Sequence, residues 1–355
     1  MLLAATAAAC ERQDREDAAG QGAQPTAQAQ AAAPQTATPT PVALTVESVD
    51  QAGFTADATA SEGPTPTVLR AQILLDRTRF SPGVIDGTAG ENTRQAIAAF
   101  EAENDLSVDG QLDEAVFAKL TQLDSRPALT QYEISAQDVA GPFVASIPEK
   151  FEDMAKLKTL AYASPLELLS EKFHVTPELL QQLNPGADFS RAGQRLVVPA
   201  LGSGQLDAAI TAIVVDKGES AVRVLGEGGR LLAFYPATIG SDALPSPEGV
   251  MKVRAVAPEP NYTFDPSRLN WKGAKSKVTV QPGPNNPVGS VWIDLTKDTY
   301  GIHGTPEPRL VGKRPSHGCV RLTNWDAEEL ASRVKPGVEV RFVQGSASTP
   351  KPTTT

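Results

Sequence analysis

The sequence has little cysteine, little histidine and few aromatic residues. Its 355 residues include 2 cysteines and 3 histidines, and Phe, Trp and Tyr together make up 5%. Two cysteines are too few for a disulfide framework, and a bridge between Cys10, near the start, and the distant Cys319 is not expected. Two of the three histidines nevertheless share one stretch, residues 301–322, with Cys319. The sequence therefore directs attention to that stretch as a place where chemistry is carried out.

The sequence also lacks any cluster of Lys and Arg. The formal net charge at pH 7 is −10, from 32 Lys and Arg against 42 Asp and Glu. The positive surface that holds the phosphates of nucleic acid is therefore missing. After the N-terminus there is no run of about 20 apolar residues, the length that a membrane-spanning helix needs. Nucleic acid is thus excluded as a partner, and no spanning segment is predicted.

Both ends of the chain have the composition of unfolded segments. Residues 1–10, MLLAATAAAC, are small and apolar and precede the polar ERQDRED, which resembles the end of a lipoprotein signal peptide with Cys10 as the acylated residue. No Lys or Arg precedes this stretch, and an incidental Cys10 is the alternative. Residues 11–64, rich in Ala, Gln, Pro and Thr, are predicted to be a disordered linker, and residues 344–355 a disordered tail. The resemblance implies a lipid-anchored protein of the periplasm or cell envelope.

A chain of this length is expected to contain two or three folded domains. In residues 65–123, three short apolar runs at helical spacing are separated by SPG and DG turns, which predicts three helices. The residues that resemble the pattern of the peptidoglycan-binding domain of cell-wall enzymes are, in order, Gln72, Asp86, Gly87, Gly90, Thr93, Ala96, Phe100, Asp109 and Gly110. The alternative is a small helical bundle whose DG turns only cap helices.

Residues 158–200 predict a small module of two helices and a closing strand, RLVVP. The pattern of Phe-x-Val, Asn-Pro and Gly-Gln-x-Leu-x-Val-Pro resembles a LysM module, a small α+β binder of glycan that contains N-acetylglucosamine. At residues 163–165 the sequence ASP replaces the Gly-Asp-Thr of that pattern, so the fold is expected more strongly than sugar binding. His174, in this segment, is expected to be a packing or surface residue.

Residues 207–343 show alternating apolar runs joined by Gly-containing turns, which predicts a mainly β domain with a catalytic or binding role. Its one predicted helix, NWDAEELASRV, has Asn324 as the expected N-cap and acidic residues in its first turn. The chain is therefore predicted to be multidomain, with a small three-helix domain and a small α+β module ahead of a mainly β domain.

His303, His317 and Cys319 lie in a stretch with several prolines and glycines, so we expect them on loops at strand ends. Three interpretations fit these residue types. Cys319 can attack an acyl carbon as a thiolate while an imidazole accepts its proton. Two imidazoles and a thiolate can instead bind zinc with an open fourth position. In the third interpretation, Cys319 is a small buried apolar residue and the histidines are structural.

The order of residues in this stretch favours the first interpretation, in which Cys319 is a nucleophile. IHGTPEPRLVGKRPSHGCVRL resembles the L,D-transpeptidase catalytic motif, in which His-Gly-Thr is followed, after a variable loop, by Ser-His-Gly-Cys-[Val/Ile]-Arg-Leu. Upstream, YPATIG (235–240), PSPEGVMKV (245–253) and GPNNPVGSVWIDL (283–295) resemble other segments of this family. The resemblance covers residues 207–343 and implies a mainly β L,D-transpeptidase catalytic domain.

The same resemblance implies roles for individual residues. Cys319 is the nucleophile, and His303 is the base that accepts its proton while the carbonyl group of Gly304 orients the ring. The backbone amides of Gly318 and Cys319 are candidate oxyanion donors. With two histidines near one thiol, an exchange of roles between His303 and His317 stays open.

Three further residues complete the expected site. Ser316 and His317 are expected to shape the pocket around the thiol. Arg321 either binds a carboxylate of the substrate in a bidentate manner or forms a structural salt bridge beneath the loop.

The implied substrate is a peptidoglycan stem tetrapeptide. Cys319 attacks the carbonyl carbon before the terminal D-Ala, and the resulting thioester passes to an acceptor. A diaminopimelate amine of another stem gives a 3-3 cross-link, a lysine of a lipoprotein gives protein attachment, and water gives L,D-carboxypeptidase activity. No metal or organic cofactor is implied. A non-catalytic cell-wall-binding protein is the rival interpretation, and the intact Ser-His-Gly-Cys sequence argues against it.

Overall fold

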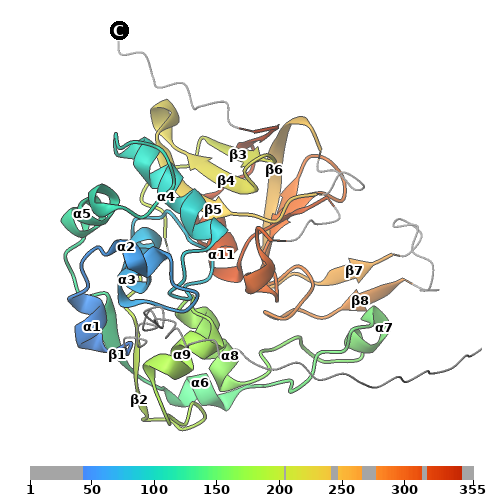
Figure 1. Cartoon of the computed structure of the whole chain (residues 1–355). Coiled ribbons are helices and arrows are strands. Elements are labelled where there is room, and N and C mark those ends of the chain that lie inside the picture. The colour runs from blue at the N-terminus through green and yellow to red at the C-terminus, as the bar shows by residue number, and fades with distance from the viewer. Residues whose placement is uncertain (1–42, 204, 241–246, 266–276, 314–317, 346–355) are drawn as a thin grey trace, which may run out of the picture. The chain divides into compact units, whose positions relative to one another are not determined.

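The computed structural model describes residues 43–203, 205–240, 247–265, 277–313 and 318–345 (Figure 1). They belong to one compact unit, Pro41–Thr355. The predicted signal remnant, most of the predicted linker and all but two residues of the predicted tail lie outside the described residues. The same holds for Ser316 and His317.

The N-terminal part of the described chain is helical. Its helices are α1 (Val46–Asp50), α2 (Ala56–Thr59), α3 (Pro66–Arg77), α4 (Glu91–Glu103) and α5 (Glu114–Leu123). The side chains of Thr65 and Asp113 cap α3 and α5 by accepting backbone N–H bonds of the first turn. The apolar faces of α3, α4 and α5 meet in one core. The prediction of a three-helix domain is therefore confirmed.

The predicted linker is wrong over its final residues, where α1 and α2 form. This segment does bury apolar side chains: Val49 is fully buried, and Phe54 packs against the core of the three helices. In addition, Oδ1 of Asp50 accepts hydrogen bonds from the backbone N–H groups of Ala128 and Leu129. The low apolar content of the segment as a whole concealed these few anchoring residues.

A second small module is built around the antiparallel pair β1 (Leu129–Glu133) and β2 (Arg195–Pro199). Between the two strands lie α6 (Ala136–Ala140), α7 (Phe151–Met154), α8 (Pro165–Lys172) and α9 (Pro177–Leu183). Helices α8 and α9 and strand β2 are the elements that the sequence predicted. The predicted start at residue 158 is too late, because β1, the partner of β2, precedes it. Membership of the LysM family stays a prediction.

The C-terminal part is dominated by one eight-stranded mixed sheet with the strand order β11-β10-β9-β6-β12-β3-β4-β5. Its strands are β3 (Ala212–Asp216), β4 (Ala221–Leu225), β5 (Leu231–Pro236), β6 (Gly249–Pro258), β9 (Val291–Leu295), β10 (Gly301–His303), β11 (Val320–Arg321) and β12 (Glu339–Val343). Strands β7 (Tyr262–Phe264) and β8 (Val278–Val280) pair separately, and η1 (Glu227–Gly229) and η2 (Pro308–Leu310) are short 3-10 turns. The prediction of a mainly β domain is confirmed.

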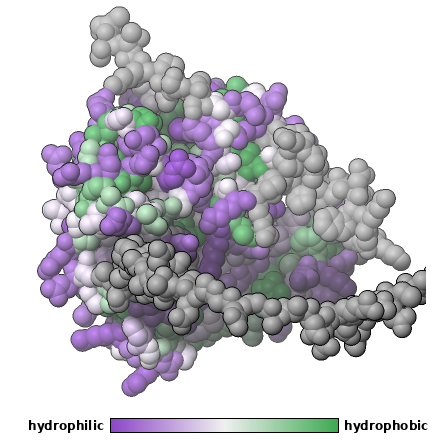
Figure 2. All heavy atoms as spheres, viewed as in Figure 1, coloured by the Kyte–Doolittle hydropathy of each residue, from purple (hydrophilic) through white to green (hydrophobic). Residues whose placement is uncertain are grey.

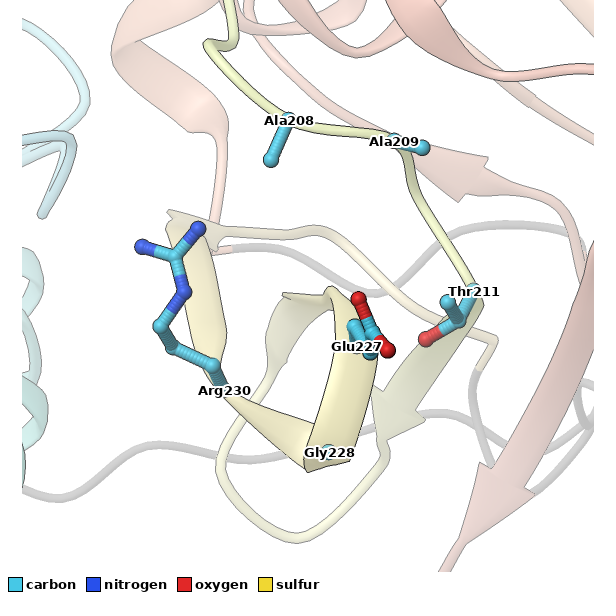
Figure 3. A pocket seen from close by; sticks show the side chains of 6 residues that line it. All are labelled: Ala208, Ala209, Thr211, Glu227, Gly228 and Arg230. Atoms are coloured by element: carbon cyan, nitrogen blue, oxygen red, sulfur yellow. The ribbon is translucent and has the colours of Figure 1, made fainter.

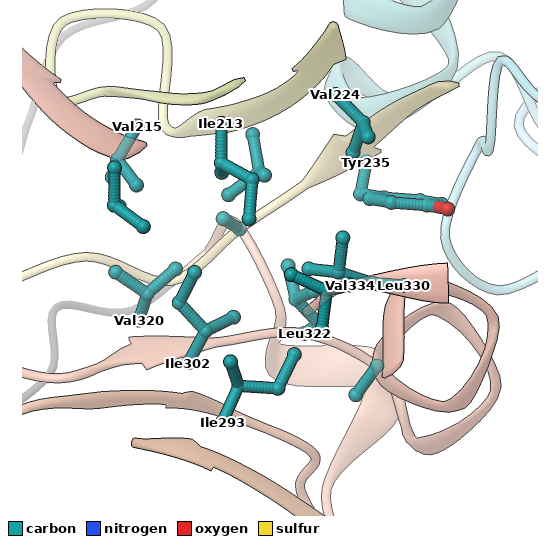
Figure 4. Close-up of a cluster of buried hydrophobic side chains, with 14 of the residues drawn as sticks. Ile213, Val215, Val224, Tyr235, Ile293, Ile302, Val320, Leu322, Leu330 and Val334 are labelled. Atoms are coloured by element: carbon teal, nitrogen blue, oxygen red, sulfur yellow. The ribbon is translucent and has the colours of Figure 1, made fainter. Parts of the chain in front are cut away.

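The sheet curls around its own core. The long strand β6 pairs with β12 at one end and β9 at the other, with a register shift between Val253 and Ala255. Such a bulge bends a strand, so the two halves of the sheet can face each other. In Figure 4, Ile213 and Tyr235 face Ile302 and Leu322 across the interior. Side chains alternate between the two faces of each strand, and the apolar side chains on the inner face fill one shared core.

Helix α11 (Asn324–Arg333) directly follows β11 and packs into this core through Leu330. Its N-cap is Thr323, whose Oγ1 accepts the backbone N–H of Asp326, and not Asn324 as predicted. Asn324 is the first helical residue, and its side chain forms hydrogen bonds with residues outside the helix. A polar residue on either side of a helix start satisfies the same sequence pattern, so the pattern alone could not place the cap.

The helical domain covers the outer strand of the sheet. Residues 79–81 pair with β5 through hydrogen bonds in which the N–H of Phe234 donates to Arg79 and the N–H of Ser81 donates to Phe234. The side chain of Phe234 lies in the core of the three helices. A sheet edge covered in this way cannot pair with another chain.

The surface of the described part is mostly polar. On the face shown in Figure 2, hydrophilic residues predominate and apolar residues occur in scattered groups. Among the described residues, the large apolar side chains that are exposed are Val46, Val108, Leu123 and Val250. No described helix combines the length and apolar character required to traverse a bilayer.

Candidate active site

The strands β10 and β11 bring His303 and Cys319 to one face of the sheet. They pair in parallel, with Ile302 opposite Val320 and His303 opposite Arg321. Because side chains alternate between the faces of a strand, Ile302 and Val320 enter the core. His303, Arg321 and Cys319, which directly precedes β11, share the other face. Pairing of two short strands thus assembles residues that lie 16 positions apart in the sequence.

His303 is buried and held in one orientation. Its side chain is 3% exposed, and the ring stacks on Trp292 of β9 with centroids 5.4 Å apart. Nδ1 lies 2.6 Å from the carbonyl oxygen of Gly304, the contact that the resemblance implied. A carbonyl oxygen can only accept, so Nδ1 carries the proton and Nε2 is left as an acceptor.

The imidazole of His303 is neutral in this setting. Burial lowers the pKa of His303 to about 3, and the positive charge of Arg321 contributes in the same direction. The backbone of Gly304 and of Val288 acts in the opposite sense but is outweighed. A neutral ring with an unprotonated Nε2 is the form that a general base requires.

Cys319 is half-buried, and its Sγ lies 3.5 Å from the carbonyl oxygen of Thr299. Burial raises the pKa of the Cys319 thiol, while a hydrogen bond from the backbone of Gly301 and the charge of Arg321 act to lower it. The resting residue is therefore a thiol rather than a thiolate at neutral pH. It needs a base to become a nucleophile.

Gly318 and Arg321 flank Cys319. Gly318 has φ 116°, a backbone conformation that favours glycine. The backbone of Arg321 is bonded to Thr238 on its other side. Its Nε is buried and has no hydrogen-bond partner within the described ranges, and no ion pair of Arg321 is formed there. The predicted alternative of a structural salt bridge therefore finds no partner in the described part of the chain.

The described residues contain no group of three or more His, Cys, Asp and Glu side chains that could hold a metal ion. His174 lies elsewhere in the fold. Its Nδ1 is 2.9 Å from Oδ1 of Asp76, and its ring stacks on Trp325. It is a packing residue, as expected from the sequence. Burial acts to lower the pKa of His174, but Asp76 beside it raises the pKa overall.

Comparisons with known proteins identify the family of this chain. A family model described as "L,D-transpeptidase catalytic domain" matches residues 210–342, and one described as "Putative peptidoglycan binding domain" matches residues 64–120. A protein of Bacillus licheniformis named "Putative L,D-transpeptidase YkuD" is 32% identical over 177 residues, which cover 49% of this chain and 91% of that protein. The chain belongs to the L,D-transpeptidase family.

Further similar proteins are also named L,D-transpeptidases. "Probable L,D-transpeptidase YcfS" of Escherichia coli K12 is 32% identical over 188 residues, covering 50% of this chain and 58% of that protein. The solved structure of an L,D-transpeptidase from Mycobacterium smegmatis has a TM-score of 0.32 at 20% identity, covering 42% of this chain and 63% of that one. The sequence matches, rather than this structural likeness, show that the chain is an L,D-transpeptidase with a peptidoglycan-binding domain ahead of its catalytic domain.

One residue near the thiol of this L,D-transpeptidase was missed in the sequence. Tyr262, at the start of the β7–β8 hairpin, is half-buried. Burial raises the pKa of Tyr262, the nearby Cys319 raises it further, and Arg321 acts to lower it. The phenol therefore shares the electrostatic environment of the Cys319 thiol. Its only sequence signal is the rarity of tyrosine, of which the chain has 5.

The hairpin that carries Tyr262 is braced from outside the catalytic domain. Phe151 of α7 stacks on Phe264 with centroids 4.4 Å apart and lies 5.5 Å from the ring of Tyr262. Figure 1 shows α7 beside β8. Because α7 belongs to the segment between β1 and β2, the module ahead of the catalytic domain supports the strand that carries Tyr262.

A separate hollow of about 550 Å³ lies away from these residues. Figure 3 shows Ala208, Ala209 and Thr211 on the segment that leads into β3, and Glu227, Gly228 and Arg230 on the turn between β4 and β5. None of the residues implicated in the transpeptidase chemistry lines it.

Proposed function

We propose that this L,D-transpeptidase uses Cys319 as the nucleophile and His303 as the general base on peptidoglycan stem tetrapeptides. The observation that carries the proposal is the joint placement of the two side chains. They lie on one face of the paired strands β10 and β11, and the Nδ1 bond to Gly304 leaves Nε2 as an acceptor. This arrangement suits acyl transfer to a thiol.

In the first half-reaction a C–S bond replaces a C–N bond, and one proton passes from the thiol to the leaving amine. Nε2 of His303 takes the proton from Sγ of Cys319 as the sulfur attacks the carbonyl carbon that precedes the terminal D-Ala. The C–N bond then breaks, and the departing D-Ala amine takes the proton back from the imidazolium, leaving a thioester. Burial raises the pKa of the thiol and lowers the pKa of the imidazole, so neither the thiolate of Cys319 nor the imidazolium of His303 is stable on its own. Proton transfer is therefore expected to accompany attack rather than precede it.

The backbone amides of Gly318 and Cys319 are the proposed donors to the oxyanion. The conformation of Gly318 favours glycine, and a residue without Cβ lets a substrate carbonyl approach closely. Arg321 is the proposed partner of a stem-peptide carboxylate, because its buried Nε lacks a hydrogen-bond partner within the described residues. Ser316 and His317 are proposed to shape the pocket.

In the second half-reaction an amine attacks the thioester. An amine of diaminopimelate on another stem gives a 3-3 cross-link, and the lysine of a lipoprotein gives an attached protein. Water in place of the amine gives L,D-carboxypeptidase activity. We propose amine transfer, since the chain belongs to a transpeptidase family. The match of residues 64–120 to the peptidoglycan-binding model supports peptidoglycan as the partner.

The experiment is incubation with a disaccharide tetrapeptide, with and without an acceptor amine, followed by mass spectrometry of the products. The proposal predicts loss of D-Ala together with a cross-linked dimer. Cys319→Ala should yield neither product. Trimmed tripeptide alone, at every acceptor concentration, would favour carboxypeptidase activity instead.

We also propose that the protein works in the periplasm or cell envelope, held at a membrane by a lipid on Cys10. The support is the sequence around Cys10 and the family's action on peptidoglycan. The native protein should partition with membranes, and Cys10→Ala should move it to the soluble fraction. Equal partition of both forms would contradict the anchor.

A further inference from the structure

Asn324 has a buried side-chain amide beside Gly304, which directly follows His303 at the end of β10. It is 2% exposed. Its Nδ2 donates to Oε2 of Glu171 at 3.0 Å and to the carbonyl oxygen of Pro284 at 3.2 Å, and its Oδ1 accepts the backbone N–H of Ser290 at 3.2 Å. Asn is a poor helix former, and Thr323 already caps α11. The needs of the helix therefore do not explain an amide at this position.

The amide is packed against the peptide that orients His303. A Cβ placed on Gly304 would lie 2.2 Å from Oδ1 of Asn324. A Cβ placed on Gly289 would lie 2.2 Å from the same oxygen, 2.5 Å from the carbonyl carbon of Gly304 and 2.6 Å from the backbone nitrogen of Thr305. The Asn324 amide and the peptide between residues 304 and 305 therefore occupy the space that these side chains would need. That peptide contains the carbonyl group that accepts the Nδ1 proton of His303.

The main partner of Asn324 comes from outside the catalytic domain. Glu171 lies on α8, in the module ahead of the catalytic domain, and is 8% exposed. Burial raises the pKa of Glu171 to about 7. Its carboxyl group also lies 3.4 Å from the hydroxyl of Tyr162. A helix of the module thus reaches the surroundings of the catalytic base through one hydrogen bond to Asn324.

We infer that Asn324 is a positioning residue for His303, and that Glu171 of the preceding module holds Asn324 in place. The inference rests on the proposed role of His303 as the base. With the amide in place, the Gly304 carbonyl stays aligned with Nδ1, so Nε2 remains free of a proton. Without it, the peptide gains room to rotate, and the ring also populates the tautomer with the proton on Nε2. That tautomer cannot accept the proton of the Cys319 thiol.

The test uses the full chain labelled with 15N in its histidines. Only three histidines are present, so His174→Gln and His317→Gln suffice to assign the signals of His303. At pH 7 the wild type should show only the Nδ1–H tautomer of His303, and Asn324→Ala and Glu171→Ala should show both tautomers. Glu171→Gln should resemble the wild type, because its amide oxygen still accepts from Asn324.

Turnover of the tetrapeptide should fall as the tautomer with the proton on Nε2 of His303 becomes populated. We expect kcat to fall about tenfold or more in Asn324→Ala and Glu171→Ala, while KM changes less than about twofold, since the substrate contacts are intact. A matched control is Asn184→Ala. Asn184 is also a buried amide with three hydrogen bonds, to the carbonyls of Leu180 and Val197 and from the N–H of Val197. Its removal should lower stability but leave the His303 tautomer and kcat unchanged.

A folded Asn324→Ala variant with a pure Nδ1–H tautomer and wild-type kcat would overturn the inference. If that variant does not fold, the Glu171 pair decides, and equal tautomer ratios in Glu171→Ala and Glu171→Gln would overturn it. A mixture of tautomers with unchanged kcat would support the positioning role but contradict His303 as the base. The failure of the proposed function is thereby distinguished from the failure of the inference.

Discussion

Gly301 is the position where one added methyl group should disturb the site most directly. A Cβ placed there would lie 2.5 Å from Cζ2 and 2.6 Å from Cε2 of Trp292, whereas ordinary van der Waals contact begins at 3.4 Å. Trp292 in turn stacks on His303, with ring planes 21° apart. In Gly301→Ala the indole must therefore move by nearly an ångström, or β10 must bend. Either change displaces the imidazole.

Two magnitudes follow from this clash. Overpacking of this kind costs about 1–3 kcal/mol of unfolding free energy, and a misplacement of about 1 Å can reduce a rate by about 100-fold. We therefore expect Gly301→Ala to lower kcat/KM for the tetrapeptide by about 100-fold and to unfold at lower urea concentration. Adding Trp292→Leu should restore part of the stability, since the clash is removed, but not the activity, since the stacking surface is lost.

Gly63→Ala provides the control, because a Cβ placed on Gly63 has nothing within 4 Å. It should match the wild type in both urea unfolding and turnover. The reasoning would be refuted if Gly301→Ala turned over tetrapeptide at the wild-type rate, because stacking on Trp292 would then not be what holds His303 in its active position.

Three further predictions concern the same site. Phe151→Ala should raise KM several-fold with little change in kcat, because it removes the ring that braces the hairpin of Tyr262, whereas Phe151→Tyr should retain the wild-type KM; equal effects in steady-state kinetics would show that the stacking is unimportant. Because the imidazole is neutral and burial raises the thiol pKa, alkylation of Cys319 should titrate above the range of an ordinary exposed thiol, and its midpoint should not shift in His303→Ala, although acylation slows about 100-fold. A midpoint below that range that rises in this variant would show a thiolate–imidazolium pair instead. The pKa of His303 is about 3 in the folded state and about 6.5 when unfolded, so the unfolded state binds more protons and stability is lost as pH falls from 6.5 toward 3; at pH 4 the loss is about 3 kcal/mol, and pH-dependent melting should be less steep in His303→Gln.

The helices and the family motif around Cys319 could be predicted because their signals are local. A cap, an apolar stripe and a following turn lie within one segment, as in α3 and α5. The sequence around Cys319 is likewise a contiguous motif. The motif alone does not predict that β10 pairs in parallel with β11. That pairing depends on the fold of the domain.

The missed features depend on contacts between distant segments. Strand β1, LTQYE, has no alternating pattern of apolar residues and is paired with β2, which lies far along the chain. Helix α1 forms because Val49 is buried and Asp50 bonds to Ala128 and Leu129. The engagement of Asn324 by Glu171 joins residues 153 positions apart. No local pattern contains such information, so these parts emerge only from the folded chain.

The central claim, acyl transfer through Cys319, is tested most directly by trapping the intermediate. The enzyme is mixed with stem tetrapeptide in the absence of an acceptor amine, quenched with acid, digested and mapped by mass spectrometry. The account predicts a tripeptide acyl group, formed with loss of D-Ala, on the peptide that contains Cys319, and no adduct in Cys319→Ala. An acyl group on another residue, or product formation by Cys319→Ala, would contradict it.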